Sequence, residues 1–137
     1  MKLSKTSEYA LRILTFMATS PDELYPARHL IEKLKISDKY LRRLMTDLSK
    51  AGFIRSIQGR EGGYIFAKDI SSIHISEIID AVEGMDKYMG CVLGFDECSD
   101  SNPCVMHESW LPMREKFIDT LNNKTLADYN YSKINKF

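Results

Sequence analysis

Hydrophobic residues in the first half of the chain recur at helical spacing in three successive segments. From Thr6 to Thr19 they return every three or four positions, which predicts an amphipathic helix with one buried face. A second helix is predicted from Pro26 to Leu34, with the proline as its first helical residue. Ser37 is a suitable N-cap for a third helix, which Gly52 ends. The apolar positions of the third helix are Leu41, Leu44, Met45 and Leu48.

Two short extended runs follow these helices, at residues 53–57 and 63–67. The loop between them contains Gly59 and Gly62, and glycine tolerates the positive φ angles that tight connections require. The pattern therefore predicts a β-hairpin. Three helices followed by a hairpin are the element order of a winged helix-turn-helix.

The second half is predicted to contain two more helices separated by an irregular loop. A short helix spans Ile75 to Val82 and is closed by Gly84, whereas residues 86–103 show no periodicity. Pro103 is expected to open a long final helix that reaches about Asn122, with Pro112 either kinking it or shifting its start. The predicted fold is mainly α with a small β-hairpin: a winged helix-turn-helix (1–84), a cofactor-binding loop (85–104) and a dimerisation helix with a tail (105–137).

Charge is distributed unevenly although the net charge is zero. Residues 1–68 carry 13 Lys/Arg and 7 Asp/Glu, whereas residues 69–137 carry 6 and 12, so the halves differ in sign. This asymmetry predicts an N-terminal surface that can meet a polyanion such as double-stranded DNA. Glu8 and Arg12 interrupt the apolar start of the chain, and no segment is long and apolar enough to span a bilayer. We therefore expect a cytoplasmic protein without a membrane partner.

In a helix-turn-helix the second helix of the pair enters the major groove with its N-terminal residues over the base edges. Arginines on that helix can bond guanine bidentately, a lysine is better suited to a phosphate, and an arginine on the wing can enter the minor groove. All of these side chains would otherwise be ordinary solvated residues. The candidate DNA-contacting residues are Arg28, Ser37, Asp38, Lys39, Arg42, Arg43 and Arg60.

All three cysteines fall within fourteen residues, at Cys91, Cys98 and Cys104, and His107 follows three positions later. An odd number of cysteines cannot form a complete set of intrachain disulfides, so reduced thiols in a reducing compartment are expected. A cluster of soft ligands this dense is typical of a metal or iron–sulfur site. Zinc is less favoured because the usual tight CxxC pair is missing. The alternative is a set of metal-free thiols or a thiol switch.

Several segments together resemble the Rrf2 family of bacterial winged-helix regulators. They are MKLSKTSEYALRIL, YLRRLMTDLSKAGFIRSIQGREGGYIFAKD and HISEIIDAVEG, all before residue 85. Within that family, CVMHESW and LNNKTLADY are similar to the iron–sulfur-assembly branch typified by IscR. The resemblance implies a homodimer in which each subunit offers one winged helix and the long C-terminal helices join the subunits.

The IscR-like resemblance implies that Cys91, Cys98, Cys104 and His107 hold a [2Fe–2S] cluster. A second branch, typified by the nitric-oxide sensor NsrR, holds a [4Fe–4S] cluster with three cysteines and an acidic residue on the first helix of the other subunit. Glu8 stands at the matching position, so it is the alternative fourth ligand. We favour His107 and [2Fe–2S], although the first cysteine gap holds six residues where about five are expected.

The sequence therefore predicts a DNA-binding transcriptional regulator whose operator affinity is controlled by an iron–sulfur cluster. The cluster would sense redox state, nitric oxide or cluster supply. The alternative is a cluster-free repressor on the same fold that responds to thiol chemistry or to a partner. Enzyme classes are disfavoured because the chain has no phosphate-binding loop and no nucleophile–base pair, so no catalytic residue is predicted.

Overall fold

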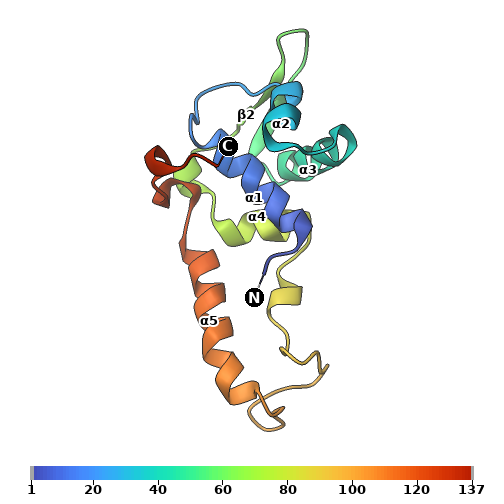
Figure 1. Cartoon of the computed structure of the whole chain (residues 1–137), viewed down its shortest axis with the longest axis vertical. Helices are drawn as coiled ribbons and strands as arrows, with labels where there is room; N and C mark the ends of the chain where they lie inside the picture. Colours follow the sequence, from blue (N-terminus) through green and yellow to red (C-terminus); the bar gives the residue numbers. More distant parts are fainter. Residues whose placement is uncertain (1, 137) are drawn as a thin grey trace.

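The winged helix-turn-helix forms the upper part of the molecule in the computed structural model, which describes residues 2–136 (Figure 1). Three helices, α1 (Lys5–Met17), α2 (Ala27–Leu34) and α3 (Asp38–Lys50), precede the strands β1 (Ile54–Ile57) and β2 (Gly63–Phe66). The first helix packs beside α4 (Ile75–Val82) and α2. This arrangement confirms the predicted fold class. The predicted outer limits at residues 1 and 137 lie outside the described residues.

Local sequence signals set the ends of these helices. Ser4 and Ser37 cap α1 and α3, because their hydroxyls accept hydrogen bonds from the backbone N–H groups of Ser7 (3.4 Å) and Tyr40 (3.3 Å). Pro26 is the N-cap of α2 and not its first helical residue, so that helix starts one position later than predicted. The largest fully buried core side chains include Ile13, Leu14, Met17, Leu30, Leu41, Leu44, Met45, Leu48, Ile54, Ile73, Ile78 and Ile79.

The segment before α2 pairs with the hairpin through an isolated β-bridge. The strands β1 and β2 pair antiparallel, with Ile54 opposite Phe66. Tyr25 then bridges to Tyr64 through two backbone hydrogen bonds of 2.8 Å. The backbone approaches so closely here that a Cβ on Gly63 would lie 2.5 Å from the carbonyl oxygen of Tyr25. Only glycine fits at this position, which fixes the base of the wing against the three-helix core.

The final helix, α5 (His107–Asn123), extends away from the winged domain, and the cysteine loop runs beside its far end (Figure 1). Its near end is attached to the domain, because the N–H of Ile75 donates to the carbonyl of Lys124 at 2.9 Å. Short 3-10 turns η1 (Ile70–Ser72), η2 (Asp86–Tyr88), η3 (Leu126–Asp128) and η4 (Tyr131–Lys133) complete the chain. No helix within residues 2–136 is long and apolar enough to cross a membrane.

The predicted start of the final helix at Pro103 is wrong. Helical structure begins at His107, because Ser99 and Asn102 exchange backbone hydrogen bonds of 3.3 and 3.1 Å and hold the preceding chain in a tight turn. Cys104 therefore lies ahead of the helix and not in its first turn. Pro112 was expected either to kink this helix or to shift its start. It lies inside α5, which starts later than predicted and continues through the proline.

Candidate metal centre and nucleic-acid interface

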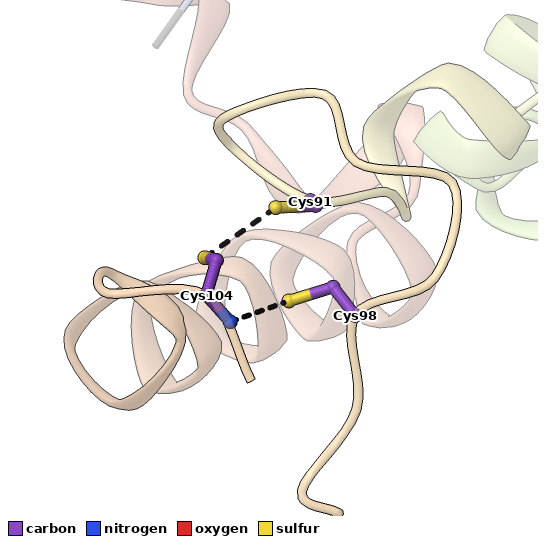
Figure 2. Close-up of side chains that lie close together, drawn as sticks. All are labelled: Cys91, Cys98 and Cys104. Carbon is purple, nitrogen blue, oxygen red and sulfur yellow. Dashed lines mark hydrogen bonds between the residues drawn. The ribbon is translucent and has the colours of Figure 1, made fainter. Parts of the chain in front are cut away.

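Three thiols converge in the loop between η2 and α5. The Sγ atoms of Cys91 and Cys104 are 3.5 Å apart, and the backbone N–H of Cys104 lies 3.4 Å from the Sγ of Cys98 (Figure 2). All three sulfur atoms lie within 4.8 Å of one another, although the residues are spread over fourteen positions of the chain. Each cysteine is half-buried and none is in a disulfide. The fold thus brings together the three cysteines that the sequence singled out.

Side chains of α5 hold the start of this loop. The guanidinium of Arg114 donates to the carbonyl of Met89 at 2.8 Å and to that of Gly90 at 3.2 Å. The indole N–H of Trp110 also donates to the Gly90 carbonyl, at 3.3 Å. Because these donors come from successive turns of one helix, the position of Cys91 is tied to α5.

His107 lies beside the three thiols, at the first position of α5. Its Nδ1 is 3.3 Å from the Sγ of Cys98, and its Nε2 is 2.9 Å from a carboxylate oxygen of Asp100. Its side chain is 11% exposed, whereas that of Asp100 is 90% exposed. Among the described residues, the group of ligand atoms within 4.8 Å of one another contains only the three cysteines. The contact of Asp100 with this histidine was not predicted, since nothing in the sequence shows which way a loop carboxylate points.

The local environment makes the thiols unequal. Backbone N–H groups, first that of Phe95 and then that of Leu93, lower the pKa of Cys91 to about 7 against the opposing effect of desolvation. At Cys98 the N–H of Cys104 acts in the lowering direction, but desolvation and the two neighbouring thiols outweigh it and raise the pKa. Cys91 therefore ionises more readily than an ordinary cysteine, and the thiolate is the form that binds soft metals.

Glu8, the alternative ligand, has other partners within its own chain. It lies in the first turn of α1, where its carboxylate pairs with Lys5 at 3.3 Å and with Lys2 at 3.8 Å. It does not belong to the group of thiols. In its predicted role it would reach the cluster of the other subunit.

Glu83 is a further charged residue near the loop, and its sequence context did not single it out. Its side chain is 8% exposed and lies at the end of α4. Burial alone would raise the pKa of this carboxyl, but the ion pair with Lys87 and the hydroxyls of Ser4 and Ser7 lower it to about 2. The only sequence signal was its place between the α4 segment and Gly84.

The seven candidate DNA-contacting residues are all exposed, as a nucleic-acid interface requires. On α3 the Nε of Arg42 bonds a carboxylate oxygen of Asp38 at 2.8 Å, so these two candidates are linked to each other. Arg42 also lines a pocket at the base of the wing together with Ser56 and Gln58. The third helix and the hairpin are therefore next to each other at this arginine.

The glycine-rich wing loop carries Arg60. Gly59 has a φ of 111°, a conformation that favours glycine, and its side of the loop is open. The loop projects at the top of Figure 1, at the end of the molecule opposite the cysteine loop. The wing loop and the three thiols therefore lie at opposite ends of the molecule.

Comparisons with known proteins agree with this architecture. The family described as Rrf2, iron-dependent transcriptional regulator, matches residues 3–130. IscR of Yersinia pseudotuberculosis, an HTH-type transcriptional regulator, is 33% identical over 129 residues, which cover 93% of this chain and 78% of IscR. Among solved structures, CymR, the global cysteine regulator of B. subtilis, is 25% identical with a TM-score of 0.75, covering 93% of this chain and 95% of CymR. The oxidized form of Staphylococcus aureus CymR is 30% identical with a TM-score of 0.73, covering 95% and 98% respectively.

Proposed function

The chain belongs to the Rrf2 family of transcriptional regulators, and we propose that an iron–sulfur cluster controls its affinity for an operator. As a transcriptional regulator it is not an enzyme. In the proposal Cys91, Cys98 and Cys104 hold the cluster, with His107 as the fourth ligand and [2Fe–2S] favoured over [4Fe–4S]. Zinc is the less favoured occupant.

The convergence of three free thiols carries this proposal. Thiolates are the usual anchors of iron–sulfur clusters, and a histidine can replace one of them. The donor set fits such a group, because three sulfur atoms lie within 4.8 Å of one another and a histidine nitrogen is 3.3 Å from one of them. Free thiols of this kind persist in a reducing compartment, so we place the protein in the cytoplasm.

The cluster would supply a cross-link whose presence and charge depend on redox conditions. This chain's own residues would then determine what that link does: Trp110 and Arg114 tie the loop to α5, while α3 and the wing would face DNA. A cluster can change operator affinity only if it stabilises one arrangement of these parts over another. The proposed readers are Arg42 and Arg43 for bases, Lys39 and Arg28 for phosphates, and Arg60 for the minor groove, with Ser37 and Asp38 at the start of α3.

A second copy of the chain is part of the proposal. Large apolar side chains are exposed on the cysteine loop and the adjoining helix, and Val105 is 92% exposed. Exposed apolar surface of this extent usually marks an interface. The residues concerned are Met89, Val92, Leu93, Phe95, Val105, Met106 and Met113. A homodimer would cover this surface and present two wings to operator half-sites about one or two helical turns apart.

The decisive experiment is anaerobic purification from lysis onward, followed by a visible spectrum and by iron and sulfide analysis. We expect a coloured protein whose chromophore is lost in Cys98→Ala and Cys104→Ala. Operator affinity should differ between the cluster-loaded and cluster-free forms. A colourless protein after reconstitution with iron and sulfide, binding DNA like the untreated form, would refute the proposal.

The fourth ligand can be tested by a matched pair of variants. His107→Ala should change the visible and electron paramagnetic resonance spectra of the bound cluster, because a nitrogen ligand is replaced. Glu8→Ala should leave both spectra unchanged. If Glu8→Ala changed the spectra and His107→Ala did not, Glu8 would be the fourth ligand and a [4Fe–4S] cluster would be favoured.

One observation favours a second candidate function, a thiol switch without a cluster. The 3.5 Å separation of the Cys91 and Cys104 sulfur atoms leaves little movement before a disulfide forms. With hydrogen peroxide as oxidant, two thiols would lose two protons and two electrons to form the disulfide, and the peroxide would be reduced to water. Iron-free protein should then show a Cys91–Cys104 disulfide by peptide mass spectrometry together with altered operator binding. Unchanged binding of the oxidised protein would exclude this function.

A further inference from the structure

The N-terminal turn of α1 is attached to the end of α4 by a single buried carboxylate. Glu83 accepts hydrogen bonds from the backbone N–H of Ser7 at 3.1 Å and from the hydroxyls of Ser4 and Ser7. Its other oxygen pairs with the ammonium of Lys87 at 2.5 Å. Ser7 is completely buried. The start of α1 therefore moves together with the chain that leads into the cysteine loop.

The same N-terminal turn also contacts the cysteine side of the molecule directly. The backbone N–H of Ser4 donates to the hydroxyl of Tyr88 at 2.9 Å, and Tyr88 precedes Cys91 by only three residues. A hollow of about 560 Å³ is lined by Ser4, Tyr88, Cys91, Trp110 and Phe117 among others. The N-terminal segment, the cysteine loop and α5 thus share one surface next to a proposed ligand.

At its other side the turn contacts α3, the helix proposed to face DNA. The hydroxyl of Tyr40 donates to the hydroxyl oxygen of Thr6 at 3.0 Å, and the rings of Tyr9 and Tyr40 meet edge to face at 5.6 Å. Tyr40 is the third residue of α3 and directly follows Lys39. A shift at the start of α1 would therefore reach the first turn of the helix proposed to enter the major groove.

We propose that residues 4–9 couple the cysteine loop to the DNA-facing helix, with Glu83 and Tyr40 as positioning residues at the two ends of this connection. The inference rests on the proposed function, since it assumes that the signal arises at the cysteines. Every link is a direct contact: Tyr88 and Glu83 hold residues 4–7, and Thr6 and Tyr9 hold Tyr40. A change of loop conformation moves the partners of Ser4 and so redirects the first turn of α3.

Two variants test the two ends. Glu83→Gln removes the charge that pairs with Lys87, and Tyr40→Phe removes only the hydroxyl that bonds Thr6. Tyr131→Phe is the matched control, because it also removes a phenolic hydrogen bond, to the carbonyl of Leu126, but lies outside the connection. The measurement is the ratio of operator Kd values for cluster-loaded and cluster-free full-length protein, with cluster content checked by absorbance.

A wild-type ratio of roughly 5- to 150-fold corresponds to ordinary allosteric coupling. We expect this ratio to fall to within about twofold of unity in Glu83→Gln and Tyr40→Phe, with the chromophore retained, and to stay at the wild-type value in Tyr131→Phe. Variants that keep the wild-type ratio would overturn the coupling and leave the proposed function intact. A wild-type ratio of one would instead refute the proposed function.

Amide hydrogen exchange tests the coupling without reference to the cluster. In cluster-free Glu83→Gln, exchange should accelerate both at residues 4–8, next to the substitution, and at residues 38–41 of α3. The Tyr131→Phe control should leave both segments at wild-type rates. Acceleration confined to residues 4–8 would contradict the proposal, because the disturbance would then stop before it reached α3.

Discussion

Glu83 holds a negative charge where burial disfavours it, and four groups from two parts of the chain compensate. Burying a carboxylate without partners would be costly, but two serine hydroxyls, one backbone N–H and a lysine surround this one. The sequence offered no means of finding this cluster, since its members are separated by almost eighty positions. Only the fold brings these groups together around Glu83.

Glu83→Gln should lower the free energy of unfolding by about 1–3 kcal/mol at pH 7, because a charged acceptor of several hydrogen bonds is replaced by a neutral one. The folded-state pKa of about 2 lies below the ordinary value of 4.5, so the charged form is the one that stabilises the fold. This contribution is complete above pH 4.5 and is lost as the pH falls towards 2.

Denaturant unfolding at pH 7 and pH 3 measures this effect. The difference between wild type and Glu83→Gln should shrink at the lower pH. Glu32→Gln, at an exposed position of α2, serves as the control and should be neutral at both values. An equal difference at pH 7 and pH 3 would show that packing, and not charge, accounts for the loss.

Arg42 and Lys39 should differ in what they contribute to DNA binding. Arg42→Ala should cost about 1–3 kcal/mol for the operator and little for unrelated DNA, if the arginine reads a base edge. Lys39→Ala should weaken binding to all sequences alike and reduce the salt slope by about one. Fluorescence anisotropy over a salt series distinguishes the two. Lys50→Ala, at the far end of α3, is the control and should leave operator affinity unchanged. An Arg42→Ala protein with unchanged operator affinity would show that Arg42 does not read a base.

The elements follow their local sequence closely where each segment carries its own signals. The three helices of the first half have apolar residues on one face and serine caps at α1 and α3, so their positions were predicted within one or two residues. The hairpin was likewise predicted from its glycines. The start of α5 was predicted wrongly, because the turn closed by Ser99 and Asn102 competes with the helix-starting signal of Pro103.

The wing depends on a contact outside its own strands, and Gly63→Ala should reveal it. A methyl group there would lie 2.5 Å from the Tyr25 carbonyl oxygen, so the bridge between Tyr25 and Tyr64 must open. We expect a loss of about 1–3 kcal/mol in the free energy of unfolding and weaker operator binding. Thermal unfolding and anisotropy measure the two effects.

Gly90→Ala is the matched control for this substitution, since its Cβ position is open and its φ is not in the left-handed region. It should leave the free energy of unfolding unchanged. A Gly63→Ala protein as stable as wild type would mean that the bridge between Tyr25 and Tyr64 does not stabilise the hairpin.

On the scale of the whole molecule, α5 and the cysteine loop expose apolar side chains that the single chain does not cover. Met113 is an exposed large apolar residue of α5, so Met113→Glu should shift the protein from dimer to monomer in sedimentation velocity experiments. Lys33→Glu introduces the same side chain at an exposed position of α2 and should leave the dimer intact. A dimer that withstands Met113→Glu would place the interface elsewhere.

The sequence by itself determined the winged helix-turn-helix, the exposed basic residues of α3 and the wing, and the identity of the three thiols. Each of these depends on local periodicity, capping or residue type, which are properties of short segments. Only the tertiary structure decided that the three sulfur atoms converge, that His107 lies beside them with Asp100 on its other nitrogen, and that Glu83 fastens the start of α1. These contacts join residues from separate segments, and their geometry depends on how the elements pack against one another.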